Sequence, residues 1–351
     1  MKYMWSLVFG FVILLSCNHE ELLFPNTDLN SRSSNEITDI RGVSYVATRN
    51  PIEASNMSPL KSIHANYVAV IPFALGTWDS PSLRFNENNQ WWGETEEGVK
   101  TTIQLARDQG QKIMIKPQVW FRGGFYTGYF ELKNEQDWTE FENNYSKYIL
   151  MFARIAEETN TELFCIGTEF EKFVNERPVY WNELIVEVRK IYKGKLTYAG
   201  NWDSYKKLSL WVNLDFIGVD AYFPLTKEKY VTEDSIRSGW KRWIDEMESV
   251  SNKFKKQIVL TEIGYRSIEF AGKEPWLSSG GQTLNLENQK LLYQVMFEEV
   301  WSRPFIEGGF LWKWFPDQIN SGGEDHLGFT PQNKPAQSEL KHQFWNYSKR
   351  K

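Results

Sequence analysis

Short apolar runs alternate with longer amphipathic stretches from Ile40 to the end of the chain. The short runs are rich in β-branched residues and predict strands, whereas apolar residues recurring every three or four positions predict helices. The eight predicted strands are residues 42–48, 67–74, 112–119, 163–170, 195–202, 216–223, 257–264 and 306–315. The predicted helices include residues 95–109, 137–159, 180–192, 235–250 and 286–301.

The predicted strands are apolar almost throughout, as in Ile258-Val259-Leu260. This pattern indicates a parallel sheet covered on both faces. Eight strand–helix units in roughly 310 residues predict an α/β fold with a single (β/α)8 TIM barrel, which typically takes about 250 residues plus loop insertions. A doubly wound open sheet would normally carry a glycine-rich phosphate turn after its first strand, and residues 44–49 contain none. We therefore predict one barrel domain over residues 40–351.

The first residues have the pattern of a lipoprotein signal. Residues 1–16 combine Lys2 with an apolar run that is too short to span a bilayer, and this predicts an export signal. The run ends in Leu14-Leu15-Ser16-Cys17, which resembles a bacterial lipobox. We predict that Cys17 is lipidated and begins the mature chain; a plain signal peptide with an incidental cysteine is the alternative.

Residues 17–39 are rich in Asn, Ser, Thr and Asp and predict a flexible tether. An exported chain with a lipidated Cys17 would be anchored to the bacterial outer membrane by lipid alone, facing either the periplasm or the cell surface. Cys165 is the other cysteine of the chain. It lies in an apolar strand, so we expect a small buried hydrophobic residue there.

Composition narrows the function. The 351 residues include 40 Lys and Arg against 45 Asp and Glu, which gives a formal charge of −5. The sequence contains no long basic run of the kind that binds nucleic acid. The four histidines are scattered and no phosphate-binding loop occurs, so we expect no metal or organic cofactor. The unusual feature is the 16 tryptophans, more than a core of this size needs. Some of them are expected to line a cleft.

Two glutamates mark the predicted catalytic centre. Chemistry in such barrels occurs at the C-terminal ends of the strands. The fourth predicted strand ends at Glu169 and the seventh at Glu262, on opposite sides of the barrel mouth. A single glutamate at a strand end is more often an ion-pair partner, but two carboxyl groups facing across a cleft are what glycoside hydrolysis requires. Glu171 is a rival to Glu169 and lies further into the loop.

Six segments in order along the chain resemble glycoside hydrolase family 113, whose known members are β-mannanases. The matching segments are residues 41–45, 115–120, 166–169, 218–224, 261–265 and 328–335. The family belongs to a clan of retaining glycosidases built on (β/α)8 barrels. The resemblance implies that Glu169 is the acid/base and Glu262 the nucleophile.

One residue departs from the wider clan. Most members carry Asn immediately before the acid/base, where it bonds the 2-hydroxyl of the sugar, and here that residue is Thr168. The contact is then lost, altered or supplied from elsewhere. Asn201, at the end of the fifth predicted strand, is our candidate substitute.

Further residues would support the two glutamates. By the resemblance, Tyr222, at the end of the sixth strand, would hydrogen-bond the nucleophile; a ring in the wall of the cleft is the alternative. Asp220 is either an indirect support or half of a core ion pair. Lys116 and Gln118 alternate on the third strand and therefore point the same way. An unpaired lysine inside a barrel is costly, so Lys116 needs sugar hydroxyls, Glu169 or another acid as its partner.

Eight tryptophans fall at predicted strand ends or in the loops that follow them. They are Trp78, Trp91, Trp92, Trp120, Trp202, Trp276, Trp312 and Trp314. Their rings suit the apolar face of a pyranose, although packing within loops is the alternative for each. We single out Trp120, Trp202, Trp312 and Trp314 as substrate-binding residues. By the resemblance, Trp314 is the platform beneath the central sugar.

The sequence thus predicts a monomeric retaining glycoside hydrolase that acts on a β-linked polysaccharide, as an endo-β-1,4-mannanase. Other β-glycans or exo action on short oligosaccharides are alternatives within the same class. A non-catalytic, glycan-binding surface lipoprotein is the alternative from another class, and both glutamates speak against it. A structural cell-envelope protein would leave the carboxylate pair unexplained.

Overall fold

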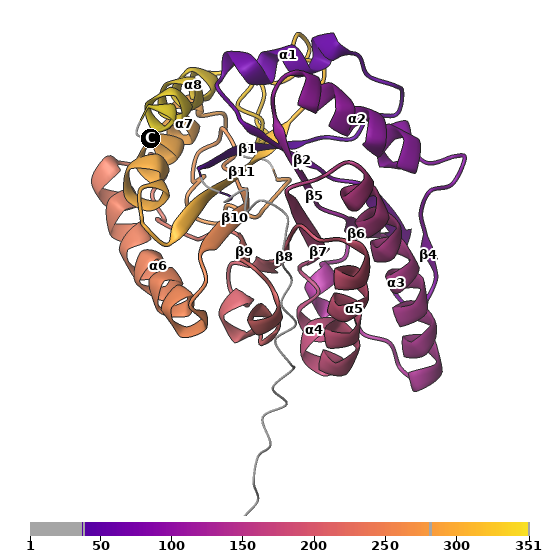
Figure 1. Cartoon of the computed structure of the whole chain (residues 1–351). Helices are drawn as coiled ribbons and strands as arrows, with labels where there is room; N and C mark the ends of the chain where they lie inside the picture. Colours follow the sequence, from indigo (N-terminus) through magenta and orange to yellow (C-terminus); the bar gives the residue numbers. More distant parts are fainter. Residues whose placement is uncertain (1–36, 38, 281–282, 350–351) are drawn as a thin grey trace, which may run out of the picture. The chain divides into compact units, whose positions relative to one another are not determined.

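A computed structural model describes residues 37, 39–280 and 283–349 of the chain. The predicted signal, Cys17 and nearly all of the predicted tether lie outside the described residues. Eight parallel strands close into a barrel, which confirms the predicted (β/α)8 fold (Figure 1). In order around the barrel they are β1 (Ile40–Tyr45), β2 (Tyr67–Val70), β5 (Lys112–Ile115), β7 (Leu163–Thr168), β8 (Lys195–Asn201), β9 (Ile217–Asp220), β10 (Ile258–Ile263) and β11 (Ile306–Trp314).

Helices surround the barrel (Figure 1). The α-helices are α1 (Ala54–Ser62), α2 (Glu96–Asp108), α3 (Glu135–Glu158), α4 (Glu171–Glu176), α5 (Pro178–Ile191), α6 (Glu233–Phe254), α7 (Leu286–Met296) and α8 (Pro335–Ser348). Short 3-10 turns cover Trp92–Glu94, Thr127–Tyr129, Tyr205–Lys207 and Leu210–Asn213, and a π-helical turn over Phe297–Trp301 extends α7. The start of α2 follows from its sequence, because the Thr95 side chain accepts a hydrogen bond from the Gly98 N–H and Glu96 opens the first turn.

Two predicted strands, residues 67–74 and 112–119, are each broken in the structure. Their second halves, β3 (Phe73–Gly76) and β6 (Gln118–Phe121), leave the barrel and form a three-stranded sheet with β4 (Leu83–Arg84). The breaks fall at Pro72 and Pro117. Proline has no N–H to donate to a ladder, so neither barrel strand continues through it. The small sheet extends one side of the barrel mouth.

The core has two layers. One cluster fills the barrel interior and includes Tyr67, Met114 and Phe310, together with Ile37 from the predicted tether. Cys165 belongs to this cluster and is fully buried, and burial raises the pKa of its thiol to about 12. The larger cluster lies between strands and helices. Three of the tryptophans, Trp181, Trp211 and Trp240, are fully buried there, so packing accounts for part of the aromatic excess.

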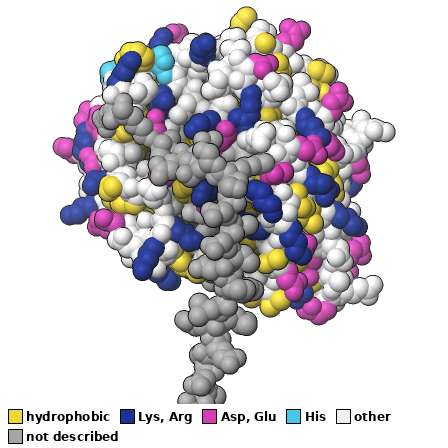
Figure 2. Space-filling model, viewed as in Figure 1, with side chains coloured by type: hydrophobic (Ala, Val, Ile, Leu, Met, Phe, Trp, Pro, Cys, Tyr) yellow, Lys and Arg dark blue, Asp and Glu magenta, His cyan; other side chains and the backbone are white. Residues whose placement is uncertain are grey.

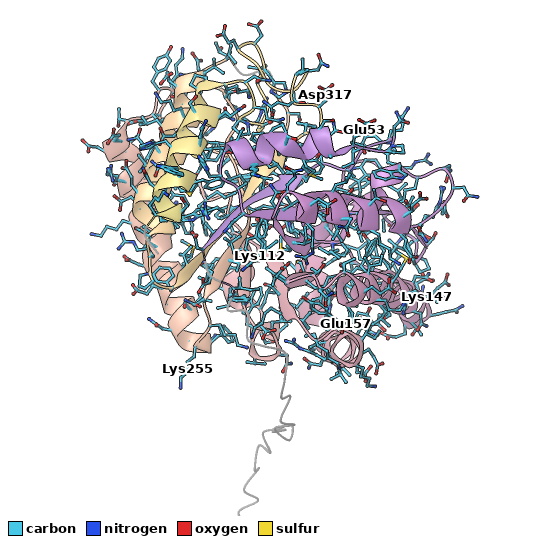
Figure 3. All side chains as sticks on the ribbon, turned by 45° about the horizontal axis from the view of Figure 1, so that its top comes forward. Glu53, Lys112, Lys147, Glu157, Lys255 and Asp317 are labelled. Atoms are coloured by element: carbon cyan, nitrogen blue, oxygen red, sulfur yellow. The ribbon has the colours of Figure 1, made fainter. Side chains whose placement is uncertain are left out.

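Charged side chains of both signs are interspersed over the face shown in Figure 2. At the barrel mouth, α1 adjoins the loop after β11, where the Asn56 side chain donates a hydrogen bond to the Pro316 carbonyl (3.2 Å). Figure 3 shows Glu53 and Asp317 close together in this region. Within the described part of the chain, no helix is long and apolar enough to cross a bilayer, and no three acidic, histidine or cysteine side chains gather as metal ligands.

Closure of the barrel requires a glycine on β11. Gly308 has φ +104°, and a Cβ at this position would lie 2.1 Å from the Ile40 carbonyl oxygen of β1. We expect Gly308→Ala to lower the free energy of unfolding by about 2–4 kcal/mol, because it adds backbone strain and separates the closing strands. Urea unfolding measures the change. Gly110→Ala is the control, since φ is +81° but no atom lies within 4 Å, and it should cost only about 1–2 kcal/mol. Equal losses would contradict the closure argument.

Candidate active site

Glu262 lies at the C-terminal end of β10, and its carboxylate accepts three side-chain hydrogen bonds. Lys116 and Gln118 both donate to Oε1, with Gln118 Nε2 at 2.7 Å, and the Tyr222 hydroxyl donates to Oε2 at 2.7 Å. The Glu262 side chain is almost completely buried. Donors on both oxygens fix the plane of the carboxylate. Glu262 is thus held in one orientation.

Lys116 links this carboxylate to a second one. Its ammonium lies 3.2 Å from Asp220 Oδ1, and both residues are 0% exposed. Burial lowers the pKa of Lys116, but the charges of Asp220 and Glu262 raise it more, so the side chain stays cationic. The Thr261 hydroxyl donates to Asp220 Oδ1 at 2.8 Å. Of the two roles open for Asp220, the structure shows the buried ion pair, and through it Asp220 positions Lys116 against Glu262.

Glu169 follows β7 in a left-handed backbone conformation, with φ +55°. Such a conformation costs a non-glycine residue about 1–2 kcal/mol and is kept only where the surroundings enforce it. Here the Glu169 N–H donates to the Ala199 carbonyl (2.8 Å), and the Phe170 N–H donates to the Tyr198 hydroxyl (2.7 Å). These two bonds tie the turn to β8 on either side of the carboxyl-bearing residue.

The two glutamates have different surroundings. Burial, and then the charges of Asp220 and Glu262, raise the pKa of Glu169 well above its usual value, which favours its protonated form. The carboxylate of Glu262 instead accepts hydrogen bonds from three side chains. Two carboxyl groups whose surroundings drive their protonation apart are the arrangement of a general acid and a nucleophile. Glu171 lies outside this arrangement, because it begins α4 and pairs with Lys207 at 3.5 Å.

Tyr126 joins the site from the loop between β6 and α3. Asn201 Nδ2 donates to the Tyr126 hydroxyl (2.5 Å), while Asn201 Oδ1 accepts from the Trp202 N–H (2.7 Å). Burial raises the pKa of Tyr126, so the phenol stays protonated beside Asn201. Sequence reasoning missed Tyr126 because it lies in an irregular loop. The aromatic-rich stretch directly after the strand of Lys116 was the available signal.

The predicted tryptophans separate into exposed and buried rings. Trp120 is 48% exposed and shares a face of β6 with Gln118. Trp202 stacks on Trp276 with ring centroids 5.0 Å apart and an interplanar angle of 17°. Trp314 is 0% exposed and packs in the core, so it offers no ring face to a sugar, contrary to the expected platform. Trp312 is the ring of β11 that reaches a cavity at the mouth.

This cavity has a volume of about 790 Å³, within the usual range for small-molecule sites. Trp91 and Trp312 contribute aromatic surface, and Glu94 and Lys313 contribute charged groups. Burial raises the pKa of Glu94 to about 7 and lowers the pKa of Lys313. Sequence reasoning missed both residues, because Glu94 lies in a 3-10 turn and Lys313 lies between two tryptophans that drew attention instead. Polar groups among aromatic rings suit a sugar.

Together, a (β/α)8 barrel with an acid and an oriented carboxylate at the ends of β7 and β10 defines a glycoside hydrolase. The chain matches the model of Glycoside Hydrolase Family 113 over residues 46–333, and it belongs to this family. This confirms the resemblance found in the sequence. No curated protein sequence matches the chain.

Solved structures of the family share the fold. The family 113 β-mannanase from Alicyclobacillus acidocaldarius, in complex with ManMIm, superposes with a TM-score of 0.78 at 21% identity over 89% of this chain and 99% of its own. A family 113 β-1,4-mannanase superposes with a TM-score of 0.76 at 26% identity, over 88% and 99%. A β-glucuronidase from Faecalibacterium prausnitzii has a TM-score of 0.59 at 13% identity and matches over 88% of this chain and 49% of its own.

Removal of the shared cation tests the role of Lys116. We expect Lys116→Met to lower glycosidase turnover by about 100-fold, because Glu262 loses one of the three donors that orient its carboxylate and is left near Asp220 without the shared cation. The variant should also be about 3–5 kcal/mol less stable, because a buried charge has lost its partner. Lys147→Met, at an exposed position on α3, is the control and should change neither property. Unchanged turnover in Lys116→Met would contradict this role.

Proposed function

We propose that the protein is a retaining endo-β-1,4-mannanase. The observation that carries the proposal is the contrast between the two glutamates at the ends of β7 and β10: burial favours the protonated form of Glu169, while Lys116, Gln118 and Tyr222 orient the carboxylate of Glu262. Retention requires a nucleophile held rigidly against the anomeric carbon and an acid on the leaving oxygen. This arrangement supplies both.

In the first step, Glu262 attacks the anomeric carbon as the glycosidic bond breaks, and Glu169 gives its proton to the departing oxygen. The sugar is then held as an ester of Glu262. In the second step, Glu169, now a carboxylate, removes a proton from a water molecule that attacks the same carbon. The ester bond breaks, Glu262 regains its charge, and Glu169 regains its proton.

Mannan is the proposed substrate because the family 113 structure at 26% identity is a β-1,4-mannanase. Exposed aromatic rings at the mouth support a polysaccharide chain that lies across it, since each can stack on one sugar. Trp120 and the Trp202–Trp276 pair offer such surfaces, and the cavity beside Trp312 has room for further sugar. Glu94 and Lys313 line that cavity, where each can form hydrogen bonds with sugar hydroxyl groups.

The catalytic pair gives the first test of this function. We expect Glu262→Ala to lose turnover of mannan by a factor of about 10⁴ or more while remaining folded, because no nucleophile remains. The wild-type rate should fall as pH rises through the raised pKa of Glu169, because the leaving oxygen then receives no proton. Glu169→Gln should remove this alkaline limb together with most of the activity. Substantial mannan hydrolysis by Glu262→Ala would refute the assignment.

The reaction products distinguish a retaining endo-β-1,4-mannanase from glycoside hydrolases with another mode of cleavage, substrate or stereochemistry. Thin-layer chromatography after short incubation with mannan should show oligosaccharides of several lengths, and NMR should show that the first product has the β-anomeric configuration. Release of monosaccharide alone would indicate exo action. Faster hydrolysis of β-glucan than of mannan would indicate another substrate, and an α-anomeric first product would indicate inversion.

We also propose that Cys17 anchors the enzyme to the outer membrane through lipid, and that the enzyme acts as a monomer. The lipobox-like Leu14-Leu15-Ser16-Cys17 supports the anchor. We expect Cys17→Ser to abolish incorporation of radiolabelled palmitate and to release the protein from the membrane fraction, with Cys165→Ser as the control that keeps the label. Labelling that survives Cys17→Ser would contradict the anchor.

A further inference from the structure

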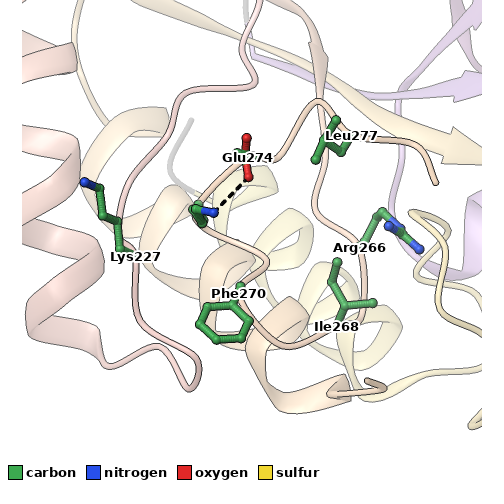
Figure 4. A pocket seen from close by; sticks show the side chains of 7 residues that line it. Lys227, Arg266, Ile268, Phe270, Glu274 and Leu277 are labelled. Atoms are coloured by element: carbon green, nitrogen blue, oxygen red, sulfur yellow. Dashed lines mark ion pairs between the residues drawn. The ribbon is translucent and has the colours of Figure 1, made fainter. Parts of the chain in front are cut away.

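A second cavity, of about 460 Å³, lies beside the loop that follows β10 (Figure 4). Its apolar lining includes Ile268 and Phe270. Its charged lining consists of three cations and one acid, namely Lys227, Arg266, Lys273 and Glu274. Glu274 is already paired with Lys273 at 3.1 Å. The lining therefore keeps an excess of positive charge, with Arg266 and Lys227 on opposite sides of that ion pair in Figure 4.

Arg266 is the unusual member of this lining. The side chain is 7% exposed, yet its Nε and Nη1 atoms are buried without a hydrogen-bond partner, and among the described residues no carboxylate pairs with it. Arginine is seldom buried in this way, because an unpaired and desolvated charge is expensive. Burial accordingly lowers the pKa of the guanidinium.

A second buried cation lies close to Arg266. Lys334 is almost completely buried, and its ammonium donates to the Ser267 hydroxyl (2.9 Å) and to the Gly328 carbonyl (2.8 Å), both uncharged partners. Burial and the charge of Arg266 lower the pKa of Lys334 to about 7. Burial lowers the pKa of His326, and the charges of Lys334 and Arg266 lower it further. Basic groups thus gather behind the end of β10 without an anion to balance them, in the part of the chain that the structure describes.

The loop that lines the cavity follows the strand of Glu262 and also carries an aromatic ring. Arg266 comes four residues after Glu262, and the loop that begins with Arg266 also carries Trp276, which stacks on Trp202. Ile268 forms a β-bridge with Leu284 that closes the base of this loop. A sugar chain that leaves the mouth over Trp202 and Trp276 would therefore pass the loop that lines the cationic cavity.

We propose that this cavity binds the carboxylate of a uronic acid on the glycan, so that the preferred substrate carries acidic sugars. The proposal rests on the proposed function, since it extends the substrate of the same site. A planar guanidinium suits a carboxylate, which can accept two parallel N–H bonds and supplies the missing negative charge. Ile268 and Phe270 offer apolar surface to the ring that bears it.

Binding of single sugars tests this site without any need for catalysis. NMR titration of the wild-type protein with glucuronate, mannose and inorganic sulfate should give saturable binding of glucuronate that is at least about tenfold tighter than binding of mannose. Arg266→Gln should weaken glucuronate binding about tenfold or more. Arg154→Gln, at an exposed position on α3, is the charge-matched control and should leave glucuronate binding unchanged.

Lys227→Gln provides a second variant, because Lys227 is exposed and its loss does not threaten folding. It should weaken glucuronate binding about two- to threefold, as expected for one exposed charge. Glucuronate binding no tighter than mannose binding would overturn the proposal, as would binding that both variants leave intact. Sulfate binding as tight as glucuronate binding, with the same dependence on Arg266, would show an adventitious ion site and overturn it too. Glucuronate is bound in this test but not cleaved. Absence of glucuronate binding would therefore leave the mannanase assignment intact, and a protein that does not hydrolyse mannan could still bind glucuronate.

Discussion

The ammonium of Lys116 is the contact on which the catalytic centre depends. It joins Asp220 on β9 to Glu262 on β10, from a residue that directly follows β5 across the barrel. These three buried groups depend on one another. Without the lysine the two carboxylates would repel each other, and without the carboxylates the buried lysine would lose its proton. One ammonium therefore serves two buried carboxyl groups, and its contact with Oε1 helps to orient Glu262. Tyr222 and Gln118 then direct it.

The same network explains why Glu169 differs from Glu262. Both side chains are acids at the ends of barrel strands, but the donors are gathered around Glu262 alone. Glu169 is half-buried near Asp220 and Glu262, and burial together with their charges raises its pKa. The left-handed backbone at Glu169 is held by bonds to β8 and not by the sugar. The geometry of the acid is therefore present before substrate binds.

Much of this could be predicted from the sequence, and the parts that could not have physical reasons. Apolar periodicity is set by burial on both faces of a strand, so the eight barrel strands were predictable, and the carboxyl groups followed from their place at strand ends. Pro72 and Pro117 break two strands, but the apolar pattern continues on both sides of each proline. The pattern therefore predicted one strand in each place and did not predict the small sheet. Tyr126 and Glu94 lie in irregular loops, where no period applies. Trp314 was predicted at the cleft from its place at a strand end and from the family resemblance, and neither of these shows whether a ring is buried.

The break at Pro117 also fixes the distance along the backbone between Gln118 and Trp120. Gln118 and Trp120 both belong to β6, which is hydrogen-bonded to β3 on one side, and not to a free loop. Two residues of strand span about 7 Å. The side chain that bonds the nucleophile and the exposed ring next to it are therefore separated by a fixed length of backbone. A sugar ring stacked on Trp120 would therefore lie at a distance from Glu262 that the hydrogen-bonded strand sets.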